Sequence, residues 1–347
     1  MTIWSLLTKI TTTSHNITRS LFTQTFSGLY LNPSKYSESR PKNAFTLILS
    51  QMTWQRIIRF VGQDGQEHFG EPIIESAGEL VTKLEAGTLT ASELTGSDLF
   101  EAAPTGQVLQ VKTLLGPLRS SDVPIVRCIG LNYIKHIQEG GRKPPPYPSV
   151  FIKPSETITS HDSDIPIPKV VHKTADQLDY EAELCIVIGK TCKDVPASSA
   201  LDYIAGYTAG NDVSARSWQR DPALAGGVPQ WCFSKGFDRW CPVGPMIVSP
   251  KVLDNAHGLS IKTWVNGELR QDSDTGDLLF GVPEIVAFVS QGTTLPKGTV
   301  IMTGTPAGVA MGMKPEPKWL KNGDVVYVEI GGIGRLWNKM VYDGIRQ

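Results

Sequence analysis

DYEAELCIVIG, residues 179–189, is an apolar run typical of a buried strand, and two of the acidic residues at its start are glutamates. Alternate side chains of a strand point to the same face, so Glu181 and Glu183 are neighbours. Two such carboxylates repel each other unless a positive group lies between them, and a hard cation with oxygen ligands meets that need. The pair favours a Mg²⁺ site, with Mn²⁺ or Ca²⁺ as alternatives. For the pair taken alone, the other interpretation is a polar strand end that faces water.

A third acidic side chain is expected at the same site. In residues 205–219, AGYTAGNDVSARSWQ, Asp212 follows a β-like run and precedes Arg216 and Gln219. Asp212 can complete a three-carboxylate site with the two glutamates. The same spacing allows Asp212 to cap a following helix, because its side chain can accept from the next amides. Spacing alone leaves both interpretations open.

The composition of the chain is that of an ordinary soluble protein. Its 347 residues are 40% hydrophobic and 19% charged, enough for one large or two modest domains. A net charge of -1 predicts no nucleic-acid partner and no polybasic membrane contact. The longest apolar runs fall short of the roughly 20 residues that span a bilayer. Five cysteines without a CxxC pair indicate a reducing compartment rather than a disulfide framework or a zinc ribbon.

Short β-rich runs separated by Gly and Pro dominate the chain from Pro124 onward, so the sequence predicts an α+β, β-rich fold. Residues 142–148 are rich in proline, which lacks the amide hydrogen, and are expected to form a stiff loop. The loop at 221–229 is expected near the site, where it would shape specificity. The predicted strands are 125–129, 184–188, 259–265, 300–303 and 325–330, and the predicted helices are 198–204, 283–290 and the segment after Asn132.

We expect a small N-terminal domain at 52–118 and a catalytic domain at 124–347. The small domain is predicted to hold a strand at 54–60, a turn at 62–65 and a helix near 77–84. His68 and Glu71, which lie in a Gly/Pro context, are predicted to form a turn.

Residues 1–51 differ from the rest of the chain. They contain five basic residues, a single acid (Glu38), and many Ser and Thr. This composition is typical of a mitochondrial transit peptide, so a location in the mitochondrial matrix is expected. The alternative is translation from Met52, which predicts a cytoplasmic enzyme.

Five motifs, in their usual order, resemble those of the fumarylacetoacetate hydrolase family. The resemblance covers residues 124–341 and implies a mixed β-sandwich or roll with a small N-terminal domain. Within the family, the chain is most similar to the mitochondrial branch of fumarylacetoacetate hydrolase domain-containing protein 2. The motifs are GLNYIKHIQE at 130–139, DYEAEL at 179–184, NDVSAR at 211–216, SKGFD at 234–238 and TGTPAGV at 303–309.

The resemblance implies a metal site and a set of binding residues. Glu181, Glu183 and Asp212 would bind Mg²⁺ as a Lewis acid that stabilises a substrate enolate. Lys235 resembles the family lysine that donates to the substrate carboxylate or a developing oxyanion, although a surface lysine is the plainer interpretation. The groups carried over for substrate orientation are Arg216, Gln219 and Thr305, and Lys153 is a further substrate-binding candidate.

His136 and Glu139 resemble the family's lid dyad. The resemblance implies that Glu139 orients His136 as a general base. Residues three apart share a face of a helix, but this spacing is weak evidence because His68 and Glu71 have it too. The plainer interpretation is an exposed histidine near an acid.

The implied activity is that of an enzyme for a small 2-oxo or β-dicarbonyl acid. The first hypothesis is hydrolysis of a carbon–carbon bond in an acylpyruvate, and the second is keto–enol tautomerisation of oxaloacetate. Decarboxylation of oxaloacetate would use the same enolate. A hypothesis of another class is an inactive binding or scaffold homologue.

One feature departs from the pattern of the family. Fumarylacetoacetase itself has an additional aspartate ligand upstream of its histidine, whereas residues 127–133 contain no acid. This difference favours the branch with small substrates. The resemblance also implies a homodimer, for which the sequence itself shows no interface.

Overall fold

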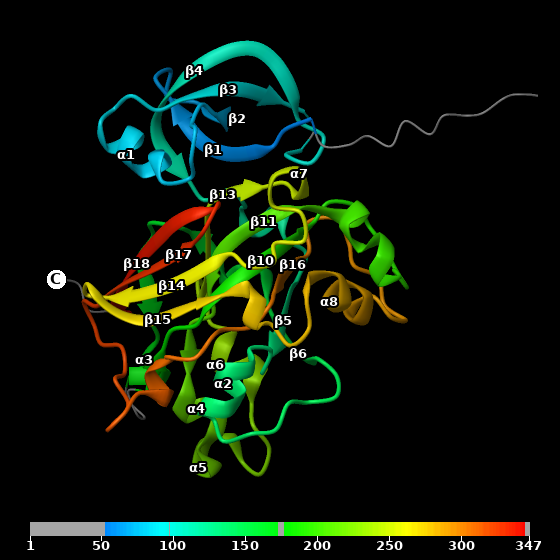
Figure 1. The fold of residues 1–347 in the computed structure, drawn as a ribbon. Helices are drawn as coiled ribbons and strands as arrows, with labels where there is room; N and C mark the ends of the chain where they lie inside the picture. The colour runs from blue at the N-terminus through cyan, green and yellow to red at the C-terminus, as the bar shows by residue number, and fades with distance from the viewer. Residues whose placement is uncertain (1–52, 97, 173–176, 344–347) are drawn as a thin grey trace, which may run out of the picture. The chain divides into compact units, whose positions relative to one another are not determined.

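The computed structural model of the chain describes residues 53–96, 98–172 and 177–343 (Figure 1). These residues belong to one compact unit. The predicted transit peptide at 1–51 and the alternative start Met52 lie outside the described residues. Among the helices that are described, none has both the length and the apolar character needed to cross a membrane.

The strand that contains Glu183 and directly follows Glu181 lies inside the largest sheet. All residues of β10 (Ala182–Ile188) are buried, which accounts for its nearly continuous apolar run. Its antiparallel neighbours are β11 (Ile204–Asn211) and β16 (Val300–Met302). The sheet continues through β13 (Cys241–Val248) with β7 (Ile158–Ser160) on one side, and β5 (Val126–Gly130) with β6 (Ser149–Lys153) on the other.

The N-terminal module continues this sheet. Its strand β1 pairs with β13, with Arg56 opposite Val248 and Ile57 opposite Ile247. Trp54 shares a hydrophobic core with residues of β5 and β16. The domain boundary between residues 118 and 124 stays a prediction. The elements of the module are β1 (Arg56–Gly62), β2 (Glu67–Pro72), α1 (Glu79–Glu85), β3 (Thr90–Thr95) and β4 (Ala103–Leu115).

The turn predicted at His68 and Glu71 is wrong, because both residues lie in strand β2. Pairing with β1 orders this segment, and the ring of His68 stacks on Phe60 with centroids 5.6 Å apart. Residues three apart in a strand point to opposite faces. His68 instead contacts Asp64 and Glu93, so it forms no pair with Glu71.

A second sheet packs on the first and gives the fold its two layers. Strands β14 and β17 contact β10, and β18 contacts β13. Inward residues alternate with partly exposed ones along β17, as expected for a sheet with one buried face. This arrangement confirms the predicted α+β, β-rich class. The strands are β14 (Ser260–Val265), β15 (Glu268–Asp274), β17 (Val325–Ile330), β18 (Gly334–Tyr342) and β8 (Ile165–Ile167), with a separate short pair, β9 (Leu178–Asp179) and β12 (Ser214–Ala215).

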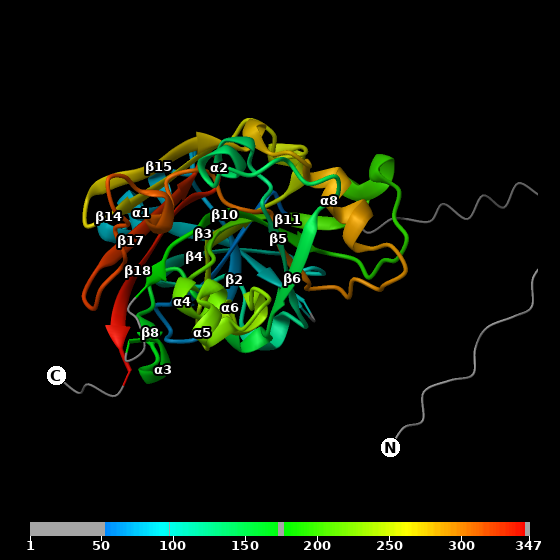
Figure 2. The same cartoon turned by 90° about the horizontal axis from the view of Figure 1, so that it is seen from below.

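Short helices fill the connections, and Figure 2 shows α4, α5 and α6 grouped together. The α-helices are α2 (Ile134–Glu139), α3 (Lys169–His172), α4 (Arg216–Arg220), α5 (Pro222–Ala225), α6 (Trp231–Lys235), α7 (Pro250–Leu253) and α8 (Val282–Val289). The 3₁₀ turns are η1 (Ser120–Asp122), η2 (Ser155–Thr157), η3 (Ala197–Tyr203), η4 (Thr275–Asp277) and η5 (Ala310–Gly312).

The predicted elements of the catalytic region are largely confirmed. The five expected strands are present with ends shifted by at most two residues. The helix after Asn132 is α2, and the helix expected at 283–290 is α8. The helix expected at 198–204 is instead the 3₁₀ turn η3, whose Ser and Asp side chains compete with the backbone for hydrogen bonds.

The register of β10 against β11 brings the predicted acidic residues together. Ala182 lies opposite Asn211, and the Asp212 amide donates to the Glu181 carbonyl oxygen at 2.9 Å. The Glu181 amide in turn donates to the Asn211 side chain at 2.9 Å. The N-terminal end of β10 therefore lies beside the C-terminal end of β11. This arrangement brings the carboxylates of Glu181, Glu183 and Asp212 close together.

Candidate active site

Three buried carboxylates meet at this junction. Glu181, Glu183 and Asp212 each offer an oxygen, and these oxygens lie within 4.8 Å of one another. Oxygen donors at such spacing suit Mg²⁺ or another hard cation. The triad can hold a divalent metal ion.

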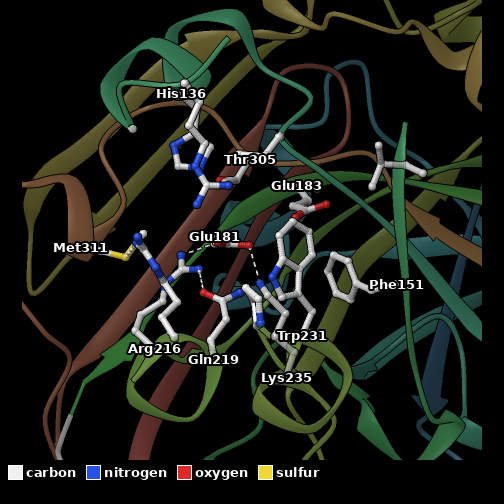
Figure 3. A pocket seen from close by; sticks show the side chains of 17 residues that line it. His136, Phe151, Glu181, Glu183, Arg216, Gln219, Trp231, Lys235, Thr305 and Met311 are labelled. Atoms are coloured by element: carbon white, nitrogen blue, oxygen red, sulfur yellow. Dashed lines mark hydrogen bonds and ion pairs between the residues drawn. The ribbon is translucent and has the colours of Figure 1, made fainter. Parts of the chain in front are cut away.

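Lys235 neutralises two members of the triad. Its Nζ donates to Glu181 Oε2 at 2.7 Å (Figure 3), and also to Asp212 Oδ2 and Ser214 Oγ, both at 2.6 Å. Burial lowers the pKa of Lys235, but Asp212 and Glu181 outweigh that effect and raise it overall. An ammonium group has three hydrogens, and all three are in use. Lys235 lines a pocket beside the carboxylates, together with Glu181 and Glu183. It can donate to a substrate in this pocket only by releasing one of its three hydrogen bonds.

Lys153 supports Asp212 from within the protein. Its Nζ donates to Asp212 Oδ1 and to the Trp240 carbonyl oxygen, both at 2.6 Å. The side chain is fully buried and is not among the described residues that line the pocket. The structure therefore does not bring Lys153 to the substrate position expected from the sequence. The alternative interpretation of Asp212 as a helix cap is wrong, because Ala215 is the N-cap residue of α4.

Asp179 extends the row of acidic side chains and anchors Arg216. Arg216 Nε donates to Asp179 Oδ2 at 2.8 Å, while its Nη2 donates to Glu181 and its Nη1 to Gln219 at 3.0 Å. Asp179 also accepts from the Ala310 amide at 2.7 Å. Arg216 thus holds Glu181 and Gln219 in fixed positions at the base of the pocket.

Glu181 and Glu183 have opposite electrostatic environments. Burial raises the pKa of Glu181, but the charges of Arg216 and Lys235 outweigh it and hold the pKa well below its usual range. Burial raises the pKa of Glu183 well above its usual range, and repulsion from Asp212 and Glu181 raises it further. Glu183 is therefore the carboxylate that most needs a positive neighbour.

The donor set fits a bound cation. Glu183 accepts from the Gly304 amide at 2.6 Å, and among the described residues it has no cationic hydrogen-bond partner. An ionised carboxylate buried in this way is costly unless a positive charge compensates it. The surrounding cluster holds one more carboxylate than cation, with Asp179, Glu181, Glu183 and Asp212 facing Lys153, Arg216 and Lys235.

His136 and Glu139 form a hydrogen-bonded pair on α2, and His136 lines the same pocket as Lys235. His136 Nδ1 lies 2.9 Å from Glu139 Oε2, and Glu139 Oε1 accepts from the Gly308 amide at 2.9 Å. Their side chains are 13% and 20% exposed. Because Nδ1 contacts Glu139, Nε2 is the nitrogen available to the pocket. Figure 3 shows the imidazole pointing toward the space beside Glu181.

The pocket has a volume of about 120 Å³ and an aromatic wall. The rings of Phe151 and Trp231 pack edge to face with centroids 5.3 Å apart (Figure 3). Gly130 makes room for Trp231, since a Cβ at residue 130 would lie 2.0 Å from the indole ring. Pro229, from the loop expected near the site, also lines the pocket. This wall suits an apolar part of a small ligand.

Two arginines add positive charge to the pocket. Arg142 follows α2, Arg220 ends α4, and both line the pocket together with Met311. Within the described ranges neither guanidinium forms an ion pair, and Arg220 Nη1 contacts Met311 Sδ at 2.8 Å. Burial lowers the pKa of Arg220, as do the charges of Arg142 and Arg216. Like charges around one cavity favour an anionic ligand.

Comparison with known families decides the membership of this chain. Residues 125–341 match the family described as fumarylacetoacetate (FAA) hydrolase C-terminal. The chain belongs to the fumarylacetoacetate hydrolase family. It is 40% identical over 292 residues to a caffeoylpyruvate hydrolase of Neonothopanus nambi, a match that covers 82% of this chain and 93% of the relative.

Two further members link the chain to different reactions. The mitochondrial oxaloacetate tautomerase Fahd2a of Rattus norvegicus is 40% identical over 229 residues, covering 66% of this chain and 69% of the relative. This likeness agrees with the branch of the fumarylacetoacetate hydrolase family inferred from the motifs. The crystal structure of 2-hydroxyhepta-2,4-diene-1,7-dioate isomerase from Mycobacterium marinum has a TM-score of 0.67 and 36% identity, covering 84% of this chain and 99% of that one.

Several residues in or around this site were not predicted from the sequence. Asp179 could have been predicted as a neighbour of the carboxylate site, because it lies two residues before Glu181 on the same face of the chain. Phe151 and Trp231 carried no such signal, since aromatic residues in short apolar runs usually belong to the core. Gln271 lies far along the chain and reaches the site only through the second sheet.

Proposed function

We propose that this protein is a divalent-metal-dependent hydrolase that cleaves a carbon–carbon bond in a small acylpyruvate. The observation that carries the proposal is that His136, which is paired with Glu139, lines the same pocket as Glu181 and Glu183 of the carboxylate triad. A general base can activate a water molecule, and a metal ion held by three carboxylates can polarise the carbonyl group that the water attacks. The likeness to a caffeoylpyruvate hydrolase supports the same class of substrate.

The metal in this proposal is Mg²⁺, with Mn²⁺ or Ca²⁺ as alternatives, and its ligands are Glu181, Glu183 and Asp212. When bound, such a cation supplies Lewis-acid polarisation of the substrate oxygens. The raised pKa of Glu183 supports this assignment, as does the absence of a cationic hydrogen-bond partner for it in the part of the chain that the structure describes.

The proposed roles of the lid pair follow from its contacts. His136 takes a proton from water through Nε2, and Glu139 keeps the imidazole in that orientation. The water oxygen forms a bond to the C4 carbonyl carbon of the acylpyruvate, and the C3–C4 bond breaks. The electron pair of that bond stays with C3, which takes up a proton. The products are pyruvate and the carboxylic acid of the acyl group.

The remaining residues are proposed to bind and orient the substrate. Gln219 and Thr305 line the pocket, and Arg216 fixes the amide of Gln219 so that its Nε2 is left for a ligand. Lys235 would contribute by exchanging one of its three bonds for a substrate oxygen. Lys153 would act only through Asp212.

The second candidate function is keto–enol tautomerisation of oxaloacetate, and decarboxylation of oxaloacetate is a variant of it. The guanidinium groups of Arg142 and Arg220, which form no ion pair with any described residue, favour this candidate because they can receive the second carboxylate of a dicarboxylic acid. The likeness to the rat oxaloacetate tautomerase supports it as well. Tautomerisation needs only a proton shuttle, which His136 can provide.

A product-resolved assay separates these candidates. The purified protein is incubated with acetylpyruvate and with fresh oxaloacetate, each with Mg²⁺ and with chelator, and His136→Ala serves as the control. Metal-dependent release of pyruvate and acetate supports hydrolysis. Faster keto–enol exchange of oxaloacetate without pyruvate supports the tautomerase, and pyruvate formed from oxaloacetate supports the decarboxylase. No turnover and no metal binding would leave the inactive binding or scaffold homologue.

Location and assembly extend the proposal. We propose a mitochondrial matrix protein, supported by the composition of residues 1–51 and by the mitochondrial relative from rat, with a cytoplasmic enzyme starting at Met52 as the alternative. Fluorescent fusions of the full chain and of the chain from Met52 test this. The homodimer also stays a prediction, and light scattering of the purified protein tests it.

A further inference from the structure

Gln271 on β15 reaches the site from behind. It is fully buried and is not among the described residues that line the pocket. Its Oε1 accepts from the Ala182 amide at 3.1 Å and from Thr263 Oγ1 at 2.7 Å. Its Nε2 donates to Thr305 Oγ1 at 2.8 Å and to the Pro306 carbonyl oxygen at 2.9 Å. The amide therefore uses both acceptor positions and both donor hydrogens.

Two backbone groups determine which way this amide faces. The Ala182 amide can only donate, so it must meet Oε1. The Pro306 carbonyl can only accept, so it must meet Nε2. A rotated amide would set donor against donor and acceptor against acceptor in a buried place, which is costly. The orientation of Gln271 is thus set by groups that cannot change their roles.

This orientation determines the direction of the Thr305 hydroxyl. Because Gln271 Nε2 donates to Thr305 Oγ1, that oxygen is an acceptor and its own hydrogen points elsewhere. Among the described residues, the Thr305 hydroxyl donates no hydrogen bond, and Thr305 lines the pocket with 4% of its surface exposed. The hydrogen is therefore directed to the ligand space. In the same way, Arg216 Nη1 donates to Gln219 Oε1 and so orients the Gln219 amide with its Nε2 toward the pocket. Thr305 and Gln219 therefore both offer hydrogen-bond donors to the pocket.

We propose that Gln271 is a positioning residue that fixes Thr305 as a hydrogen-bond donor to an anionic oxygen of the substrate. The proposal rests on the proposed function, since it requires that the pocket binds a 2-oxo acid. Through Ala182, Gln271 also ties this donor to the strand segment between Glu181 and Glu183. The buried side-chain amide of Gln271 therefore fixes the position of the Thr305 hydroxyl relative to Glu181 and Glu183.

A double-mutant cycle on the full chain tests the proposal. A hydrogen bond to a charged group is worth about 1.5–3 kcal/mol, so Gln271→Met and Thr305→Val should each lower kcat/KM for acetylpyruvate by about 10- to 100-fold. In the Thr305→Val background, Gln271→Met should cost less than about threefold more, because its effect passes through Thr305. Thr305→Ser should recover most of the loss seen in Thr305→Val. Equal losses from Gln271→Met in both backgrounds would overturn the proposal and assign Gln271 a structural role.

Two further variants protect the test against misfolding. Gln271→Glu keeps the acceptor for Ala182 and Thr263 but replaces the group that donates to Thr305 and to the Pro306 carbonyl oxygen, so it should lose activity, and its melting temperature reports the cost of the lost Pro306 contact. Thr263→Val is the matched control, because it perturbs the same buried network but leaves Nε2 bonded to Thr305. It should lower the melting temperature yet keep kcat/KM within about twofold. A wild-type rate for folded Gln271→Glu would also overturn the proposal.

A binding measurement separates this inference from the proposed function. If the wild-type protein turns over neither acetylpyruvate nor oxaloacetate, the proposed function fails, and calorimetric binding of pyruvate becomes the readout of the same cycle. Coupled losses of pyruvate affinity in the Gln271 and Thr305 variants would then support the positioning role by itself. Additive losses, or pyruvate affinity unchanged in all variants, would overturn it.

Discussion

The carboxylate site and the lid pair are built in different ways. Glu183 lies in β10, Glu181 directly precedes that strand and Asp212 directly follows β11, and buried cations hold Glu181 and Asp212. His136 and Glu139 stand on a six-residue helix, are partly exposed, and are tied to the rest of the site by the Gly308 amide. Charge and burial secure the first region, whereas a few hydrogen bonds secure the second.

This difference suggests that ligand binding and turnover can be separated. A helix as short as α2 is not stable alone and depends on its anchors. Its anchors include buried Ile137 and the Asn132 side chain, which donates to the Thr303 and Phe280 carbonyl oxygens at 2.7 and 3.1 Å. Changes in the carboxylate site should therefore remove metal binding, while changes in the lid pair should remove only the chemistry.

The largest effect is expected for Glu183→Ala. Removal of one of three carboxylates breaks the chelate, so measurable Mg²⁺ binding and turnover should both be lost. Calorimetric titration with Mg²⁺ measures this, and Glu316→Ala, which removes an exposed carboxylate elsewhere, is the control. The metal-free variant should unfold at the wild-type temperature or above, because a repelled carboxylate is gone. Unchanged Mg²⁺ affinity would contradict the ligand assignment.

The next effect is expected for His136→Ala. Mg²⁺ affinity should stay near that of the wild type, while kcat falls roughly 100- to 10,000-fold through loss of the general base. His68→Ala is a matched control, because His68 also contacts acidic side chains but belongs to β2 in the N-terminal module. If His136→Ala weakens Mg²⁺ binding as much as it slows turnover, the two regions are not separable.

The pH dependence of metal binding should be smaller and should arise from Glu183. Its raised pKa means that the metal-free protein holds a proton there whenever the pH is below that pKa, and Mg²⁺ must then displace this proton. Affinity should therefore rise with pH, by about tenfold per unit below that pKa. Without Mg²⁺ the sign is opposite, because the stability contributed by this proton is lost as pH rises. Titrations of the wild-type protein with Mg²⁺ in two buffers of different ionisation enthalpy count the released proton, and an affinity that does not change with pH would contradict this prediction.

Local spacing indicated the three members of the carboxylate triad but left the role of Asp212 open. Glu181 and Glu183 share a strand face by geometry alone, and Asp212 ends the run that pairs with that strand. The lid pair needed more, because His68 and Glu71 have the same spacing as His136 and Glu139 and form no pair. Only the motif around His136 distinguished the two cases.

Contacts between distant segments were beyond the reach of the sequence. Lys153 was expected at the substrate but points into the core, since the inward face of β6 depends on how the sheet packs. Gln271 is in register with Thr263 across β14 and β15, yet its contact with Thr305 spans the two sheets. Such a role follows from tertiary packing, which no local pattern contains.

The smallest effect is expected for Gly312→Ala, which tests the lid pair without touching its side chains. A Cβ at residue 312 would lie 2.4 Å from Glu139 Cδ and 2.5 Å from its Oε1, so the carboxylate must shift. No positive φ constrains Gly312, so this clash is the main strain expected. Displacement of Glu139 by a fraction of an ångström should lower kcat about tenfold and leave Mg²⁺ affinity within about twofold. Gly78→Ala, whose Cβ would meet its nearest atom only at 3.9 Å, is the control. A wild-type kcat for Gly312→Ala would mean that the position of Glu139 does not limit the chemistry, and the role of the lid pair would then reduce to His136 alone.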